Sequence, residues 1–327
     1  CDKIDKLKAQ AFVMTAESRR HSMKKEILSV RSACDGLPLS IGIFSPETAN
    51  GEIKGIFQIS HGMAEHKERY FPFMEFMADN GYAAVINDHR GHGGSIKSPD
   101  DYGYFYDDTA GFIVEDLHQV TLLAKERFPG KPVTLFGHSM GSLVVRKYIK
   151  KYDDEIDKLI VCGSPSANPL VGAAIALVRA EKAVKGDRHR SMAIQKLAFG
   201  SYTKNLSGSL SDNAWLSVNT DNVKDYDKDR MCGFVFTLNG FRNLFLLMKQ
   251  VYDPKGWNVK NPDLPILFLA GAEDPVIAGE KNWHKSQDLL RQVGYRNISG
   301  ILYPGLRHEI LNEASRQDIY ENILEFA

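Results

Sequence analysis

The sequence has few cysteines, no excess of charge of either sign and no long apolar run. Its four cysteines lie far apart and form no CxxC pair, which argues against a disulfide framework and a thiolate metal site. Lys plus Arg and Asp plus Glu number 41 each, so no global positive field would attract nucleic acid. The longest nearly apolar run, residues 169–178, is about half of the roughly 20 residues that span a bilayer. These absences favour a small neutral or amphipathic substrate and exclude nucleic acid as an expected partner.

The start of the chain is basic and carries no hydrophobic leader segment. We expect residues 1–25 to form a helical extension with a solvated basic face; transient contact with an anionic lipid surface is the alternative. The missing leader and the sparse cysteines predict a cytoplasmic protein, with a lipid anchor through Cys1 as the alternative. The basic residues of this segment are Lys3, Lys6, Lys8, Arg19, Arg20, Lys24 and Lys25.

Short β-type runs alternate with helical periods along most of the chain. Apolar residues recur at helical spacing in residues 70–77 and 145–152. Such alternation is typical of a mostly parallel central sheet with helices on both faces. Ahead of it, the chain reads as two strands joined near Asp35 and Gly36, which adds an antiparallel edge. The β-type runs are residues 53–60, 83–87, 133–136, 158–162, 265–270 and 298–303.

The alternation stops for about a hundred residues after the fourth of these runs. Because structureless connections of that length are rare in compact domains, we expect a mainly helical cap, roughly residues 165–262. The cap would be inserted in a single domain that spans residues 1–327. Residues 233–252 are so rich in Phe, Leu and Met that we expect burial on more than one face. They form either the core of the cap or the wall of an apolar substrate tunnel.

The segment FGHSMGS contains the pattern GxSxG between a β-type run and a helical period. In that setting the pattern is typical of a nucleophile elbow, a strand-to-helix turn too tight for side chains on its flanks. The turn lifts the hydroxyl of Ser139 above the sheet, and the helix N-terminus offers the backbone N–H of Met140 to a developing oxyanion. An ordinary glycine-rich turn is the alternative. The pattern predicts that Ser139 is a nucleophile.

A nucleophilic serine needs a base and an orienting acid, which in this arrangement follow it in the order Asp or Glu, then His. Asp274 and His308 each follow a β-type run, where sheets of this class place functional groups. Glu273 is the rival acid, and we favour Asp274 because neighbours on extended backbone point in opposite directions. His138 is held facing elsewhere by the elbow and is expected to be structural.

The second oxyanion donor should come from the loop before the first crossover helix, where Met63 is our candidate through its backbone N–H. A metal cluster is the alternative use of the polar residues in this loop and the next. Their spacing matches no recognised ligand pattern, and serine chemistry requires no metal, so we expect hydrogen-bonded turn residues instead. These residues are His61, His66, Asp88, His89 and His92.

The segments HGMAEHKERY, NDHRGHGGS, GHSMG, GAEDPV and YPGLRHE, in this order, resemble the monoacylglycerol lipase and lysophospholipase branch of the α/β-hydrolases (serine aminopeptidase S33 type). The resemblance covers nearly the whole chain after Lys25. It implies an α/β-hydrolase fold with the triad Ser139, Asp274 and His308, an oxyanion hole from the amides of Met63 and Met140, and no cofactor. It also implies that Glu65, His66 and Arg69 support the loop. One departure is Ser142, where many relatives have a third glycine.

We therefore expect a serine hydrolase that cleaves carboxylic esters through an acyl-enzyme, with a monoacylglycerol or lysophospholipid as substrate. A short-chain carboxylesterase is the main alternative, because fold alone does not choose the substrate. A peptidase, a thioesterase and a non-catalytic binding protein are further alternatives. Activity that collapses with acyl length would indicate the short-chain enzyme, and a binding protein would not react with an organophosphate.

Overall fold

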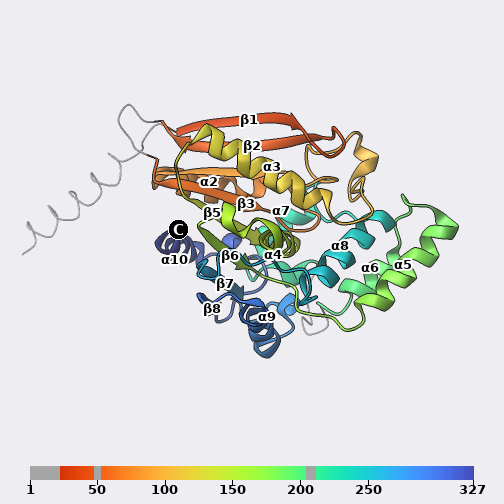
Figure 1. The fold of residues 1–327 in the computed structure, drawn as a ribbon. Coiled ribbons are helices and arrows are strands. Elements are labelled where there is room, and N and C mark those ends of the chain that lie inside the picture. The colour runs from red at the N-terminus through yellow and green to blue at the C-terminus, as the bar shows by residue number, and fades with distance from the viewer. Residues whose placement is uncertain (1–22, 48–52, 204–210) are drawn as a thin grey trace, which may run out of the picture.

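The centre of the molecule is an eight-stranded sheet (Figure 1). The computed structural model describes residues 23–47, 53–203 and 211–327. The strands are β1 (Met23–Arg31), β2 (Pro38–Pro46), β3 (Gly55–Ser60), β4 (Tyr82–Asn87), β5 (Val133–His138), β6 (Lys158–Cys162), β7 (Ile266–Gly271) and β8 (Ile298–Tyr303). Their spatial order is β1-β2-β4-β3-β5-β6-β7-β8. Only β2 runs against its neighbours, so the expected parallel sheet with an antiparallel edge is confirmed.

Strands in the middle of this sheet are buried on both faces, as parallel strands usually are. In β6, Leu159 and Val161 join one core and Ile160 and Cys162 join the other. Successive side chains of a strand point to opposite faces, so each strand feeds both cores. This explains why the sequence runs that predicted these strands are continuously apolar rather than alternately apolar and polar.

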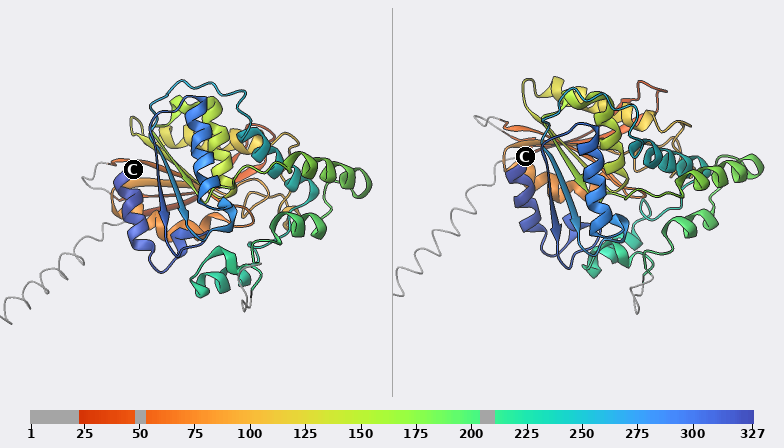
Figure 2. Two further views of the ribbon diagram at one scale, coloured as in Figure 1. Left: turned by 90° about the horizontal axis from the view of Figure 1, so that it is seen from below. Right: turned by 60° about the horizontal axis from the view of Figure 1, so that its bottom comes forward.

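Two layers of helices cover the faces of the sheet (Figure 2). The first core is closed by α3 (Phe112–Arg127), α4 (Met140–Tyr152) and α9 (Glu280–Val293). The second core is closed by α2 (Phe71–Asp79) and α10 (Arg316–Phe326). The predicted helices at residues 70–77 and 145–152 correspond to α2 and α4, with Tyr70 in the short turn η1 (Lys67–Tyr70) that precedes α2.

The segment between β6 and β7 is mainly helical and extends from one edge of the body (Figure 1). Its long helix α8 packs against α4 of the body and against α5. We call this segment the cap. Its elements are α5 (Val171–Lys185), α6 (Met192–Phe199), η4 (Ala214–Leu216), α7 (Thr220–Lys228) and α8 (Leu238–Val251). The remaining short turns are η2 (Pro99–Asp101), η3 (Asp153–Glu155), η5 (Pro275–Ile277) and η6 (Ile310–Asn312).

The expected N-terminal extension needs one correction. Met23 to Lys25 form the start of β1 rather than the end of a helix, because they pair with β2 from Met23↔Pro46 onward. Residues 1–22 and their basic side chains lie outside the described residues. Within the described part of the chain, no helix combines the length and apolarity needed to cross a bilayer.

A buried ion pair joins the first hairpin to α3. The side chain of Arg90 is fully buried, and its Nε donates to Asp116 Oδ2 at 2.8 Å. Ser32, in the turn after β1, donates its hydroxyl to the other oxygen of Asp116 at 2.5 Å. The guanidinium also donates to the carbonyl of Phe105 at 2.8 Å. Asp35, in the turn between β1 and β2, adds a longer contact to the guanidinium at 3.2 Å, so Asp116 is the nearer of two counter-charges.

We predict that Asp116→Ala lowers the free energy of unfolding by about 3 kcal/mol, because it removes the nearer counter-charge of a buried guanidinium and leaves only the longer contact to Asp35. Urea unfolding followed by far-ultraviolet circular dichroism measures the change. Glu126→Ala, at an exposed position of the same helix, is the matched control and should stay within about 0.5 kcal/mol. Equal losses in the two variants would contradict this account of the ion pair.

Candidate active site

Ser139 occupies a strained turn between β5 and α4. Its backbone lies at φ 53° and ψ −118°, a combination that costs a residue other than glycine about 1–3 kcal/mol. The flanking glycines allow it. A Cβ on Gly137 would lie 2.5 Å from the carbonyl oxygen of Gly141, and a Cβ on Gly141 would lie 2.0 Å from that of Ser60. Both are below any real contact distance, so the turn excludes side chains at these positions.

Hydrogen bonds from the neighbouring segments hold this turn. The amide of Ser139 donates to the carbonyl of Cys162 at the end of β6, at 2.9 Å. Ser142 donates twice to the carbonyl of Ser139, from its amide at 3.0 Å and from its hydroxyl at 2.5 Å. Ser142, where the resemblance to the lipase branch implies a glycine, thus bonds the backbone of Ser139. A glycine at position 142 would keep only the amide bond.

Asp274 and His308 meet at the carboxyl ends of β7 and β8. His308 Nδ1 lies 2.8 Å from Asp274 Oδ2, and both side chains are almost fully buried. The other oxygen of Asp274 accepts the amide of Val276 at 2.8 Å, which fixes the carboxylate at the start of η5. Glu273, the rival acid, is exposed. Of the two carboxylates weighed from the sequence, the one that contacts the histidine is Asp274.

The loop after β3 carries Met63 to the cavity beside Ser139. Its shape is fixed by Glu65, whose Oε1 accepts the amide of Gly62 at 2.5 Å, and by Ala64, which adopts a left-handed φ of 52°. The carbonyl of Ala64 accepts the amide of Gly233 at 2.9 Å and the hydroxyl of Tyr226 at 3.0 Å, both from the cap. Met140 is the first residue of α4, a position whose amide has no partner inside the helix.

Three buried histidines near this loop serve as neutral hydrogen-bond links. His61 accepts the amide of His89 at Nε2 and donates from Nδ1 to the carbonyl of Gly62. His92 accepts the amide of Ala64 and donates to the carbonyl of Arg90. Burial lowers the pKa of His61 to about 4 and that of His92 to about 3, and it lowers the pKa of His89 as well. Both nitrogens of His61 and His92 are engaged, so a metal would have to break these bonds.

A different group brings metal-binding atoms together in the described part of the chain. The ligand atoms of His66, Asp229 and Cys232 lie within 4.8 Å of one another. The two nitrogens of His66 already contact Glu68 and Asp229, at 2.5 and 2.8 Å. Burial opposes the charged imidazole, but the two carboxylates outweigh it and raise the pKa of His66. The group behaves as an ion pair between the loop and the cap.

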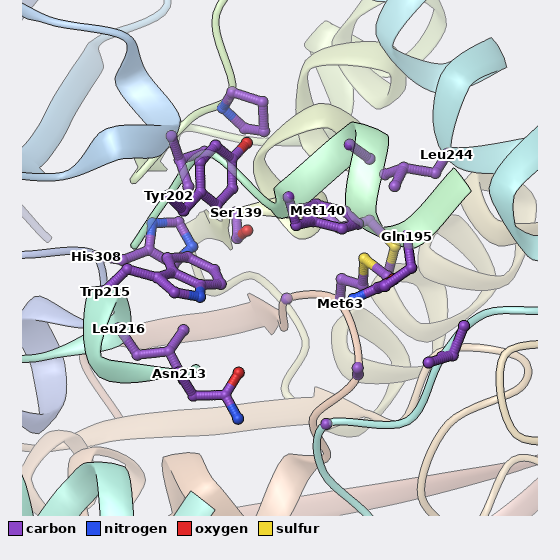
Figure 3. Close-up of a pocket in the computed structure, with 18 of the residues that line it drawn as sticks. Met63, Ser139, Met140, Gln195, Tyr202, Asn213, Trp215, Leu216, Leu244 and His308 are labelled. Carbon is purple, nitrogen blue, oxygen red and sulfur yellow. The ribbon is translucent and has the colours of Figure 1, made fainter. Parts of the chain in front are cut away.

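A cavity of about 680 Å³ opens between the body and the cap, with Ser139 and His308 in its wall. Figure 3 shows Ser139 between two sides of the cavity that carry different sets of side chains. His308 lies on one side with Trp215, Tyr202 and Asn213, and Met63, Met140 and Leu244 lie toward the other. The ring of Trp215 lies 5.1 Å from that of His308, measured between centroids. Residues 233–252 were expected to form either the core of the cap or a tunnel wall, and they do both. Phe241 and Leu247 belong to the core. Leu244, Phe245 and Met248 line the cavity.

Comparison with known proteins assigns the family. The profile of the serine aminopeptidase S33 family matches residues 51–315. The chain belongs to this family. Its fold is the α/β-hydrolase fold, since it superposes on a thermostable carboxyl esterase from Bacillus coagulans, solved with glycerol, at a TM-score of 0.85 and 25% identity. That superposition covers 93% of this chain and 98% of the esterase.

Two lipases are similar to most of the chain. A monoacylglycerol lipase from Mycolicibacterium smegmatis is 26% identical over 290 residues, which cover 88% of this chain and 92% of that protein. A soluble variant of monoglyceride lipase from Saccharomyces cerevisiae, solved with a substrate analogue, superposes at a TM-score of 0.69 with 18% identity. The superposition covers 94% of that lipase and 92% of this chain. These relatives bear the names of ester-cleaving enzymes.

Sequence reasoning missed the cap residues that lie beside His308 in the cavity. Trp215, Tyr202 and Asn213 come from turns with no helical or strand period, so no pattern pointed to them. Sequence reasoning also missed Glu309, although it follows His308 directly. Its carboxylate binds Arg69, which lies 240 residues away in the chain. Only the tertiary fold brings such residues together.

We predict that stability falls steeply as the pH drops from about 6.5 to 4.5. An unfolded histidine takes up a proton near pH 6.5, whereas folded His61 and His92 stay neutral until about pH 4 and 3. The unfolded state therefore binds at least two more protons in this window, and the free energy of unfolding should fall by about 2.7 kcal/mol per pH unit once both are charged. Urea unfolding at a series of pH values measures the slope.

The variant His92→Gln should reduce this slope by about one proton. His284→Gln, at an exposed position, should leave the slope unchanged. A stability that is flat across the same window would show that these histidines are not held neutral.

Proposed function

We propose that the protein is a serine hydrolase that cleaves carboxylic esters, with a monoacylglycerol or lysophospholipid as substrate. One observation carries the proposal: the buried pair of Asp274 and His308 lies in the wall of the same cavity as the strained Ser139. Nucleophile, base and orienting acid recur in this relation on unrelated folds, so geometry rather than position identifies them. The names of the relatives support the same reaction class.

In the proposed acylation step, the hydroxyl oxygen of Ser139 attacks the ester carbonyl while His308 Nε2 takes its proton. Asp274 accepts a hydrogen bond from His308 Nδ1, which fixes the tautomer and stabilises the imidazolium. The amides of Met63 and Met140 stabilise the negative charge that develops on the carbonyl oxygen. The imidazolium then protonates the leaving alcohol, and the acyl group remains on Ser139.

Deacylation repeats these roles with water as the nucleophile. His308 removes a proton from water, the tetrahedral intermediate forms against the same two amides, and the proton returns to Ser139 as the acid leaves. The sequence of steps needs no metal or cofactor, because every proton passes through His308. We therefore propose a reaction that a chelator does not affect.

The position of His308 orients the substrate. The leaving alcohol must receive its proton from this imidazole, so the head group belongs on the side of the cavity with Trp215, Tyr202 and Asn213. The acyl chain then extends the other way, along Met63, Met140 and Leu244. Figure 3 also places Gln195 beside Met63, so the acyl side is mostly but not entirely apolar. A cavity with mostly apolar walls and a few polar groups suits an amphipathic ester.

An aminopeptidase is a weaker candidate, despite the name of the family. A substrate amine needs an accessible carboxylate in the pocket. Glu65 and Glu309 reach the cavity wall, but Arg69 binds both of them. Asp212, the other acidic lining residue among those described, is exposed to solvent, where an ion pair with a substrate amine adds little affinity. A short-chain carboxylesterase stays the main alternative, supported by the similarity to the esterase from Bacillus coagulans.

We predict that hydrolysis of p-nitrophenyl esters peaks at medium or long acyl chains and that monoacylglycerol or lysophosphatidylcholine is also cleaved. Initial rates across the series from acetate to palmitate measure the preference. Ser139→Ala should reduce turnover by about a millionfold, because the nucleophile acts as a unit with its base. Leu244→Trp, which fills the acyl side, should shift the optimum to shorter chains. Activity confined to acetate and butyrate would favour the short-chain esterase instead.

We further propose that the outer face of the cap contacts an anionic lipid surface that carries the substrate. Leu170, Leu177 and Val184 recur at seven-residue spacing along α5, with exposed fractions of 69, 45 and 84%. Met192 and Leu197 of α6 are also exposed, and Met192 lines the cavity. Exposed basic residues, Arg179, Lys185 and Lys196, lie on the same two helices. An apolar stripe with basic flanks suits an interfacial helix.

We predict that Val184→Asp weakens binding to vesicles of phosphatidylglycerol and phosphatidylcholine by about tenfold without changing hydrolysis of a soluble short ester, because the side chain is exposed and supports no packing. Vesicle flotation measures binding. Leu122→Asp, at an exposed position on α3, is the matched control and should bind like the parent. Equal binding by all three proteins, or a dimer that Val184→Asp dissociates, would refute the lipid contact.

A further inference from the structure

Three buried charged side chains form a continuous chain of contacts behind the cavity. Arg69 donates from one terminal nitrogen to Glu65 Oε2 at 2.8 Å and to Glu309 Oε1 at 2.6 Å. Its other terminal nitrogen donates to Glu309 Oε2 at 2.7 Å and to the amide oxygen of Asn222, from the cap, at 3.0 Å. Only 4% of either carboxylate side chain is exposed. We call these three residues the Glu65–Arg69–Glu309 chain.

Each end of this chain holds a segment that the proposed mechanism uses. Glu65 accepts the amide of Gly62, so it fixes the backbone immediately before the oxyanion donor Met63. Glu309 follows the base His308 directly, and its amide donates to the carbonyl of Leu216 in the cap at 2.7 Å. The planar guanidinium lies between them and binds both carboxylates in one fixed geometry.

His138 connects the same chain to the elbow. Its Nε2 donates to the carbonyl of His308 at 3.2 Å, and its Nδ1 lies 3.1 Å from the hydroxyl of Tyr70 and 3.4 Å from Glu65. Burial disfavours its charged form, but the hydrogen bond and charge of Glu65 outweigh burial and raise the pKa of His138. Arg69 thus contacts both buried carboxylates, and His138 contacts one of them. Both ring nitrogens of His138 lie against these partners and the carbonyl of His308, so hydrogen bonds fix the ring between the elbow and the chain.

We propose that Arg69 and Glu309 are positioning residues. The Glu65–Arg69–Glu309 chain sets the loop that carries His308 (the base loop) and the loop that carries Met63 (the oxyanion loop) in one fixed relation to Ser139. The inference rests on the proposed function, since it concerns how that reaction's groups are aligned. Neither residue touches the reacting atoms. Their effect passes through the backbone of His308 on one side and of Gly62 on the other.

The chain also makes the cap part of the alignment. Asn222 donates to Glu309 at 2.7 Å and accepts from Arg69, so α7 closes the network from outside. Arg307, on the other side of His308, donates to the carbonyls of Ala214 and Ser217 at 2.8 and 3.2 Å. Residues 214–222 therefore form hydrogen bonds with the residues on both sides of His308. These hydrogen bonds connect this part of the cap to the segment that carries His308.

The test compares Glu309→Gln and Arg69→Lys with the matched control Glu313→Gln. Glu313 is also buried and also binds cap amides, those of Val218 and Asn219, but it does not contact Arg69. We expect Glu309→Gln to lower kcat by about 10–100-fold with KM changed less than about twofold, because misplacement affects the reacting geometry more than binding. Arg69→Lys keeps the positive charge but loses the planar guanidinium that binds both carboxylates, so its kcat should fall as that of Glu309→Gln does. Glu313→Gln should keep kcat within about threefold of the parent.

A second readout separates this proposal from the proposed function. The proton between His308 Nδ1 and Asp274 gives a low-field resonance in proton nuclear magnetic resonance that requires no turnover. We expect it to be shifted or broadened in Glu309→Gln and Arg69→Lys and unchanged in Glu313→Gln, at temperatures where circular dichroism shows all four proteins folded. A parent that cleaves no ester but shows this pattern would refute the function and keep the positioning role. An unchanged resonance and kcat in folded Glu309→Gln, or equal losses in Glu313→Gln, would overturn the positioning role.

Discussion

The site depends on a backbone turn that only close packing can hold. Ser139 adopts a conformation that costs about 1–3 kcal/mol, and the cost is met by the fit of two glycines against neighbouring backbone. Gly141 packs against the carbonyl of Ser60, so β3, β5 and α4 must meet before the turn can form. The strain is therefore sustained by the same sheet that forms the core. Because the hydroxyl is fixed by backbone and not by side-chain contacts, it is presented before any substrate arrives.

Polar groups around the turn are arranged so that each has one role. His61 and His92 are neutral and bind backbone, whereas His66 and His138 each contact a carboxylate that favours the charged form. His308 contacts Asp274 and lines the cavity. Five histidines within a short distance of one loop thus differ through their partners alone. Environment rather than residue type therefore distinguishes these side chains.

The sequence predicted the elements whose pattern is local. The runs of β3 to β7 could be predicted because strands buried on both faces are continuously apolar, whereas β8 is largely exposed. The tight turn at Ser139 could be predicted because a strand, two glycines and a helix determine it. Asp274 and His308 could be named because parallel strands end at one edge of the sheet. The N-terminal boundary was placed three residues late, because the basic side chains of Lys24 and Lys25 lie on an edge strand that needs little burial. What the sequence could not show was the network across long separations, such as Arg69 with Glu309 or Trp215 beside His308.

The central claim is that Ser139 is a nucleophile activated by His308. It is tested most directly by incubating the protein with a fluorophosphonate and locating the adduct by intact-mass and peptide mass spectrometry. The account predicts one adduct, on Ser139, that forms at least about a thousandfold more slowly in His308→Ala, since the nucleophile and its base act as a unit. An adduct on another residue, or labelling of Ser139 at an equal rate without His308, would contradict it.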